Sequence, residues 1–353
     1  MTEAAQDPDV SAAPPMGPLL DRAQVPWLAP IRERLGALQD QGRLPHGLLL
    51  AGSPGAGQPE IAAWLGARLL CRSPAAGGAC GKCADCRLLL AGSHPDFRWV
   101  GVLPDKKEIS IDQVRALSQS LAMRSYRGGA KVSILAPAEA MNTKAFNALL
   151  KTLEEPAPET YLLLAAGRID RMPRTVASRC TRVRLPLPGE REALDWLAAR
   201  SASEAWPALL ELAGGAPFLA ADHAQEGLGA LDAEMRSAIA AAIDGRLDVV
   251  AFAEACARNA PAARIAWLES WLTRSLKAAA ARSDPVNNNR LPWLQAPAVD
   301  RKIRAGYRLL DQLRDARRQV GGSLNAQLLF EGLAVSLAGL LGTPARRSGG
   351  ASG

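Results

Sequence analysis

Residues 52–59 have the glycine spacing of a loop that binds nucleoside triphosphates. The segment reads Gly52-Ser53-Pro54-Gly55-Ala56-Gly57-Gln58-Pro59. In the motif G-x-x-x-x-G-K-[S/T], such a loop joins a strand to a helix, and here an apolar run precedes it and a helical pattern follows it. The glycines let the backbone approach phosphate, and the helix start offers N–H groups and the positive end of a dipole. The spacing predicts the backbone of a phosphate-binding loop.

Two residues of this loop are the wrong type for its usual chemistry. Gln58 stands where the motif has the lysine that reaches the β- and γ-phosphates, and Pro59 stands where a hydroxyl holds Mg²⁺. Pro59 also lacks a backbone N–H. We therefore expect a degenerate loop, marked by Gly52, Gly55, Gly57 and these two replacements, and no ATP bound by this chain.

Four of the six cysteines follow the pattern C-x8-C-x2-C-x2-C. They are Cys71, Cys80, Cys83 and Cys86. Such clustering in a cytoplasmic protein favours metal over disulfides, and four thiolates can surround Zn²⁺ in a closed, structural site. An iron–sulfur cluster and unmetallated thiols are the alternatives, although ferredoxin patterns continue with a Cys-Pro pair that is absent here. We predict a zinc module over residues 71–86. His94 is expected to make a loop hydrogen bond, and Cys256 to lie in a core.

Composition is that of a soluble globular protein with more than one domain. The chain has 353 residues, of which 48% are hydrophobic and 22% charged. Its net charge of +7 suits either contact with nucleic acid or a solvated, arginine-rich surface. No apolar run approaches the ~20 residues of a membrane helix, and no signal-peptide pattern opens the chain. We expect a cytoplasmic protein without membrane contact.

The order of apolar patterns predicts an α/β region followed by an all-helical one. Strands are predicted over 48–51, 97–100, 132–136, 161–166 and 182–185, and helices over 27–41, 60–70, 111–123 and 142–153. This alternation is typical of a parallel sheet covered on both faces. Later helices are predicted over 263–282, 298–320 and 324–341, with a loop over 285–297. We predict domains over 19–187, 188–228 and 229–341, and disordered tails over 1–18 and 342–353.

Three features together carry a family resemblance. They are the glycine loop with a Cys₄ module just after it, the sequence N-T-K-A-F-N-A-L-L-K-T-L-E-E-P over 142–156, and Ser178-Arg179-Cys180 before the last strand. The chain resembles the clamp-loader branch of the AAA+ ATPases, and within it the delta-prime subunits of bacterial DNA polymerase III. The resemblance covers about 24–340, and residues 325–331 are similar to the last helix of the family's collar domain.

The resemblance implies a fold and a set of partners. The fold is an AAA+ P-loop-type parallel-sheet domain with an inserted Cys₄ zinc module, a small helical lid domain and an all-α C-terminal collar domain. The implied assembly is a pentamer with the gamma/tau ATPase subunits and the delta subunit, which loads the sliding clamp onto primed DNA. Within it this subunit is expected to be a stator that hydrolyses no ATP.

Other positions where the ATPases of this family carry catalytic groups are also changed. The strand over 132–136 is not followed by the acidic Walker B pair that holds Mg²⁺; Glu139 is the single carboxylate nearby, and we expect it to be a solvated charge at a helix start. The sensor strand ends in residues 165–167 without a polar side chain. Residues 214–218 lack the arginine that the ATPases place in the second domain.

Arg179 is the residue that the resemblance assigns to catalysis. An arginine at a subunit edge can reach a neighbour's site and stabilise charge on the transferring phosphoryl group, as an arginine finger. Its planar donors match phosphate oxygens two at a time. The alternative is one surface arginine among many. Ser178 and Cys180 are expected to serve packing at the helix–strand junction.

Two alternatives for the function stay open at this point. One is an ATP-hydrolysing clamp-loader paralogue with unusual catalytic residues, against which Gln58, Pro59 and the missing carboxylates argue. The other is a stand-alone zinc-containing DNA-binding protein, which tight, salt-dependent affinity for primed DNA would support. The basic loop over 124–131, with its one tyrosine, is either a phosphate contact or a solvated turn. Arginines of the helix over 298–320 either meet a partner or keep the helix soluble.

Overall fold

The computed structural model describes residues 13–75, 77–104, 106–203, 205–280, 299–320 and 326–342. They form two compact units. One runs to Trp196 and includes Gly215–Leu219, and the other contains Leu197–Gly214 and the residues from Ala220 onward. The further division into a lid and a collar domain stays a prediction. Within the described ranges, no helix is both long enough and apolar enough to cross a membrane.

A parallel sheet of five strands, in the order β2-β3-β4-β1-β5, is the centre of the first unit. The strands are β1 (Gly47–Ala51), β2 (Phe97–Val100), β3 (Lys131–Leu135), β4 (Thr160–Ala166) and β5 (Thr181–Arg184). Strands β1 and β3 are buried along their whole length, as expected of parallel strands covered on both faces. The five predicted strands are confirmed, with bounds that differ by no more than one residue.

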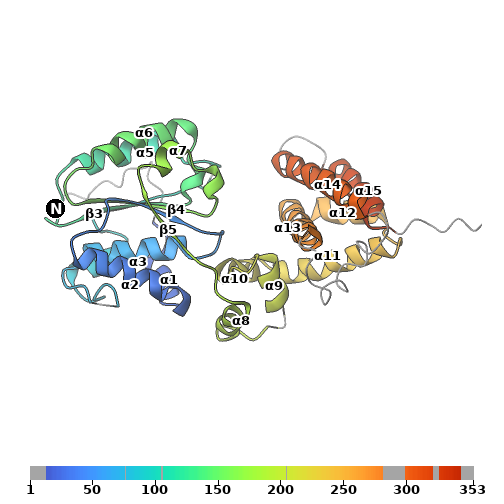
Figure 1. Ribbon diagram of the computed structural model, residues 1–353, viewed down its shortest axis with the longest axis horizontal. Helices are drawn as coiled ribbons and strands as arrows, with labels where there is room; N and C mark the ends of the chain where they lie inside the picture. Colours follow the sequence, from blue (N-terminus) through green and yellow to red (C-terminus); the bar gives the residue numbers. More distant parts are fainter. Residues whose placement is uncertain are drawn as a thin grey trace, which may run out of the picture. The chain divides into compact units, whose positions relative to one another are not determined.

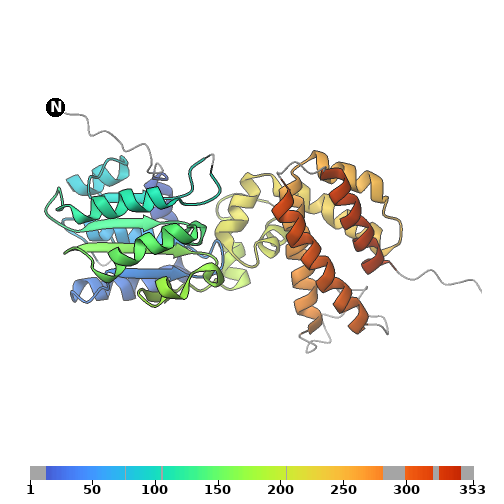
Figure 2. The same cartoon turned by 90° about the horizontal axis from the view of Figure 1, so that it is seen from above.

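Helices cover both faces of this sheet (Figure 1). On one face lie α1 (Met16–Ala23), α2 (Ala29–Asp40) and α3 (Gln58–Leu70), and on the other α5 (Ile111–Ala122), α6 (Thr143–Glu154) and α7 (Arg174–Ala177). Figure 2 looks onto the second of these faces. Each face has its own apolar core, with Trp64 and Ile61 in the first and Phe146 and Leu149 in the second. The predicted doubly covered sheet is confirmed.

Helix α1 corrects the predicted end of the N-terminal tail. The tail was expected to reach residue 18, but α1 begins at Met16. Met16 is 2% exposed and Ala23 is fully buried, both in the core that α3 also lines. The apolar side chains of this short helix therefore recur at helical spacing and pack against α3. The helix forms directly after Pro15. The rest of the predicted tail, residues 1–12, lies outside the described residues.

Helix α6, whose last residue contacts the predicted arginine finger, starts at a side-chain cap. Asn142 Oδ1 accepts a hydrogen bond from the backbone N–H of Ala145 at 2.9 Å, at the start of α6. This cap satisfies one of the donors that a helix start leaves open. Phe146, Leu149 and Leu153 then face the sheet, so that the end of α6 has a defined position beside β1.

The second unit is helical in its described residues. Its elements after α8 (Glu190–Ala198) are α9 (Trp206–Leu212), α10 (Pro217–Gln225), α11 (Leu228–Ile243), α12 (Val249–Arg258), α13 (Pro261–Ala280), α14 (Val299–Gln319) and α15 (Ala326–Leu341). The first residues of α10 belong to the other unit. The predicted loop over 285–297, residues 324 and 325 of the predicted last helix and the tail from 343 lie outside the described residues. Cys256 is fully buried, which confirms it as a core residue.

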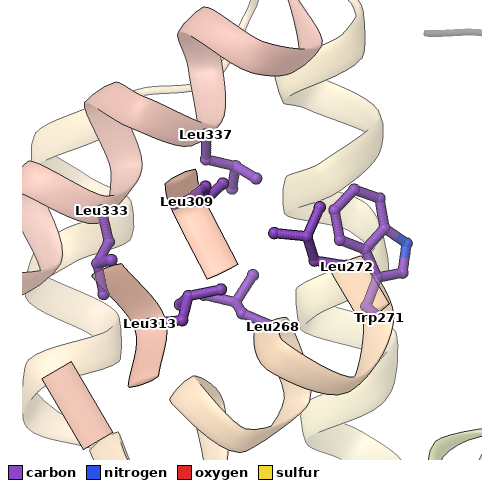
Figure 3. Close-up of a pocket in the computed structure, with 7 residues that line it drawn as sticks. All are labelled: Leu268, Trp271, Leu272, Leu309, Leu313, Leu333 and Leu337. Carbon is purple, nitrogen blue, oxygen red and sulfur yellow. The ribbon is translucent and has the colours of Figure 1, made fainter. Parts of the chain in front are cut away.

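A small cavity lies among α13, α14 and α15 (Figure 3). Its walls are Leu268, Trp271, Leu272, Leu309, Leu313, Leu333 and Leu337. Its volume is about 10 Å³, which is barely the space of one water, and six of its seven side chains are leucines, which offer no hydrogen-bond partner for a water. The cavity is therefore a packing gap in a leucine-rich core rather than a binding site.

Candidate functional site

The glycine loop joins β1 to α3, as predicted, but its glutamine points back into it. Gln58 Nε2 donates hydrogen bonds to the carbonyls of Ser53 at 2.9 Å and Ala166 at 3.3 Å, and its side chain is 2% exposed. Gly57, the residue before the helix, has φ 108°, which favours glycine. The amide of Gln58 therefore fastens the loop to the end of β4 and offers no charge to a phosphate.

Apolar side chains pack against the loop. A Cβ at Gly57 would lie 2.8 Å from Leu28 Cδ1 and 3.1 Å from Phe218 Cε2. A Cβ at Gly55 would lie 2.5 Å from Leu219 Cβ. Glycine is thus required here to admit the protein's own side chains, whereas in a nucleotide-binding loop it admits phosphate. No sequence pattern points to Phe218 and Leu219 as neighbours of the loop, because they lie some 160 residues from it along the chain.

Phe218 belongs to an aromatic cluster beside the first turn of α3. The ring centroids of Trp27 and Trp196 lie 5.7 Å and 5.1 Å from that of Phe218. Arg22 lies 5.6 Å over the same ring and forms a 3.7 Å ion pair with Glu60. Glu60 is 4% exposed in the first turn of α3, where its negative charge already interacts with the helix dipole and repels a phosphate.

Glu139 differs from its expected role as a solvated charge. It is half-buried in the turn after β3, and its Oε1 accepts a hydrogen bond from the backbone N–H of Gly167 at 3.0 Å. The carboxylate thus binds the end of β4 beside Pro54 of the glycine loop. The expectation was wrong because the N–H of Gly167, which continues β4, comes close only when β3 and β4 pair. Its bond to Gly167 is structural.

Arg179 follows the short helix α7 and is held by groups from two helices. Its Nε and Nη2 each lie 2.6 Å from Glu154 Oε1 at the end of α6. Its Nη1 donates to the carbonyl of Thr175 at 2.9 Å and lies 3.4 Å from Ser178 Oγ. The arginine side chain is 37% exposed. It is therefore partly ordered at the surface, with part of its guanidinium open to solvent.

The neighbours of Arg179 lie where helix α7 meets β5. Cys180 is 9% exposed, and burial raises the pKa of its thiol to about 11. A Cβ at Gly47 in β1 would lie 3.7 Å from Cys180 Sγ. Ser178 Oγ donates to the carbonyl of Thr175 at 3.2 Å. Cys180 thus packs against β1, whereas Ser178 is exposed and its hydroxyl bonds to the carbonyl of Thr175 in α7.

The four clustered cysteines converge. Their sulfur atoms all lie within 4.8 Å of one another, and Cys80 Sγ lies 3.9 Å from Cys86 Sγ. Sulfurs bound tetrahedrally at ~2.3 Å from zinc are roughly 3.8 Å apart. Backbone N–H groups of Cys80 and Cys83 approach the sulfurs of Cys71 and Cys80 at 3.2 and 3.4 Å. The donor set and its spacing fit a metal ion.

The environment of Cys83 favours a thiolate. Burial alone would raise the pKa of this thiol, but hydrogen bonds from the backbone of Cys86 and Arg72 outweigh it and lower the pKa to about 6. The N–H of Cys86 lies 3.4 Å from Cys83 Sγ at the start of α4 (Ala84–Leu90). A cysteine binds a metal ion as the thiolate, so the lowered pKa favours Cys83 as a ligand. The burial of Cys86 raises the pKa of its thiol, and metal binding there must displace a proton.

A buried aspartate ties the cysteine module to the basic loop. Asp85 is 1% exposed, and its two oxygens each accept a 2.7 Å bond, one from Arg72 Nε and one from Arg127 Nε. Burial would raise the pKa of this carboxyl, but the two arginines hold it below its usual value. His94 Nε2 lies 3.4 Å from Asp85 Oδ1, and His94 Nδ1 accepts from the backbone N–H of Asp96 at 3.1 Å. The predicted loop hydrogen bond of His94 is confirmed.

A second aspartate orders the basic loop itself. Asp96 is 8% exposed and accepts bonds from Ser125 Oγ at 3.0 Å and from the backbone N–H groups of Tyr126 and Arg127 at 2.7 Å each. Tyr126 is nevertheless 87% exposed. Asp96 thus anchors the loop as an ordered turn. Neither alternative from the sequence, a solvated turn or a phosphate contact, includes this anchor. Asp96 does not stand out in the sequence, since an Asp after His-Pro is an ordinary loop residue.

Asp96→Asn is expected to destabilise the protein by about 2–3 kcal/mol. An amide replaces one acceptor oxygen by an NH₂ group, which then faces the donors of the loop. Urea unfolding measures the change. Asp112→Asn, at a side chain that is 70% exposed, is the matched control and should change the free energy of unfolding by less than ~0.5 kcal/mol. Equal effects of the two changes would contradict the anchoring role of Asp96.

Comparison with known proteins gives consistent matches. Residues 29–188 match the protein family described as DNA polymerase III, delta subunit. DNA polymerase III subunit delta' of Pseudomonas aeruginosa is 43% identical over 198 residues, which are 55% of this chain and 60% of that protein. The Escherichia coli subunit delta' is 38% identical over 194 residues, 54% of this chain and 58% of that protein.

A third relative matches over most of its length. The subunit delta' of Yersinia pestis is 34% identical over 306 residues, which are 84% of this chain and 89% of that protein. The match therefore extends beyond the sheet domain into the helical unit. This chain belongs to the family of DNA polymerase III subunit delta'.

Proposed function

We propose that this chain is a clamp-loader subunit that hydrolyses no ATP and serves as a rigid stator. The observation that carries the proposal is the filled glycine loop. Gln58 is bonded to backbone carbonyls inside it, Leu28 and Phe218 pack at Gly57, and Leu219 packs at Gly55. An ATP-hydrolysing paralogue needs that space for phosphates and needs carboxylates for Mg²⁺.

The partners follow from the family. We propose a hetero-oligomer with the gamma/tau ATPase subunits and the delta subunit, which opens the sliding clamp and places it on primed DNA. The first unit would be the AAA+ domain, and the helices after residue 228 would form the collar that joins the subunits. A stand-alone DNA-binding protein is the competing function, and tight, salt-dependent binding of primed DNA by this chain alone would favour it.

Within that assembly we propose that Arg179 is an arginine finger for the neighbouring ATPase site. Its side chain is part-exposed after a short helix, and its position is defined by Glu154 and Thr175. A guanidinium can bind two oxygens of a transferring phosphoryl group at once. The finger would stabilise charge that develops on the phosphoryl group in the partner's site. This chain would bind no ATP of its own.

We further propose that Cys71, Cys80, Cys83 and Cys86 hold a structural zinc ion. The convergence of four sulfurs supports a closed tetrahedral site without an open position for water. Its role would be to fix the segment between α3 and α4 together with the first turn of α4, from which Asp85 reaches Arg72 and Arg127. Zinc would thereby order the turn around Tyr126 as well.

Restoring the missing motif residues is expected to leave the protein unable to bind ATP. In the double variant Gln58→Lys with Pro59→Thr, the lysine and hydroxyl return, but Phe218, Leu28 and Leu219 still pack against the loop. Calorimetric titration with Mg²⁺–ATP should show no binding by the wild type or the variant, and neither should release phosphate. Saturable binding by the double variant would show that residue types alone, and not the filled space, exclude the nucleotide.

A further inference from the structure

The proposed arginine finger is paired with a carboxylate of its own chain. Glu154 Oε1 faces both Nε and Nη2 of Arg179 at 2.6 Å, while Nη1 donates to the Thr175 carbonyl at 2.9 Å. A guanidinium has five N–H donors. The remaining Nη1 contact, to Ser178 Oγ, is long at 3.4 Å. These contacts hold the guanidinium from within the chain, and its part-exposed side chain keeps N–H donors for oxygens from outside.

The backbone under this pair is fixed by buried neighbours. Leu153 precedes Glu154 and Cys180 follows Arg179, and the two are 2% and 9% exposed. Both lie against Gly47 of β1, where a Cβ would be 3.2 Å from Leu153 Cδ2 and 3.7 Å from Cys180 Sγ. His46 Nε2 lies 2.9 Å from the carbonyl of Leu153. The end of α6 and the end of α7 are therefore held at a constant separation by the first strand.

We propose that Glu154 is a positioning residue for Arg179. A long arginine side chain at a surface otherwise samples many rotamers, and each misplaced rotamer removes the finger from the phosphoryl group. The carboxylate holds Nε and Nη2, so that the guanidinium is already in place before the partner's ATP arrives. Because the pair is exposed, its contribution is modest, and its loss should change the fraction of well-placed arginine about two- to five-fold.

A double-mutant cycle in the reconstituted clamp loader tests this role, which rests on the proposed function. The variants are Glu154→Gln, Arg179→Ala and their combination. Glu154→Gln should lower the DNA- and clamp-stimulated rate at the adjoining site about two- to five-fold, with the change in kcat and little change in KM for ATP. In the Arg179→Ala background, Glu154→Gln should have no further effect, because there is no arginine left to position.

Glu155→Gln is the matched control. Glu155 is exposed and adjacent, and in the described structure it forms no hydrogen bond or ion pair with Arg179, so its neutralisation should leave kcat at the wild-type value. Three results would overturn the positioning role: an unchanged or raised kcat in Glu154→Gln, an equal loss in Glu155→Gln, or a further loss on top of Arg179→Ala. If Arg179→Ala itself leaves the rate unchanged, the proposed finger fails instead.

Discussion

Arg179→Ala is expected to lower ATP hydrolysis in the reconstituted clamp loader while leaving its assembly intact. Arginine fingers accelerate phosphoryl transfer about 10³–10⁵-fold at their own site. The loss should be confined to the one site that adjoins this subunit, so the total rate of a complex with several ATPase sites falls only in part. Steady-state phosphate release, with primed DNA and sliding clamp present, measures this change.

Arg179→Lys separates charge from geometry. Lysine keeps the positive charge but loses the planar pair of donors, so it should restore little of the rate. Binding of ATP by the partner subunits should be nearly normal in both variants, since the finger acts on the transition state. A lysine variant with the wild-type rate would mean that charge alone suffices at position 179.

Cys83→Ser is expected to lose the metal and to destabilise the first unit by about 4 kcal/mol. The free energy of binding a structural zinc ion is in effect folding free energy, and three thiolates cannot close a tetrahedral site. Elemental analysis should find one zinc per wild-type chain and little in the variant, and urea unfolding should show the lower stability. Cys256→Ser, at a cysteine outside the cluster, should keep its zinc.

The zinc proposal also has a chemical alternative. Iron in protein purified under reducing conditions, or no metal in that protein, would contradict a zinc site. A Cys83→Ser variant that loses zinc and unfolds at the wild-type denaturant concentration would show that the metal does not stabilise the fold. Because Asp85 connects this module to Arg127, loss of zinc should also speed hydrogen exchange at the backbone N–H of Tyr126.

Much of this fold could be predicted because its local patterns agree with its tertiary structure. The apolar runs that became β1, β3 and β4 are bounded by glycine and proline, and the helices between them have an apolar side at helical spacing. The cysteine spacing likewise determined which four side chains meet. These features depend on residues that are close along the chain, so a single sequence is enough to predict them.

The contacts that decide the function join distant segments, and no spacing rule reveals them. Phe218 packs against the glycine loop from some 160 residues away, and Glu154 meets Arg179 only because both flank residues packed on Gly47. The misjudged Glu139 is a similar case, because its partner, the N–H of Gly167, is brought close by the pairing of β3 with β4. Changed residue types in the motif predicted that its chemistry is lost, and the structure shows which side chains pack against the loop.

A single-turnover count of ATP tests the central claim most directly. The complex, assembled with wild-type or Arg179→Ala subunit and preloaded with ATP, is mixed with clamp and primed DNA, and the phosphate released in the first turnover is counted. We predict that the variant complex binds as much ATP as the wild type but releases one phosphate fewer in this first burst. An equal burst from the two complexes, at the same rate, would contradict a finger supplied by this chain and leave it a scaffold.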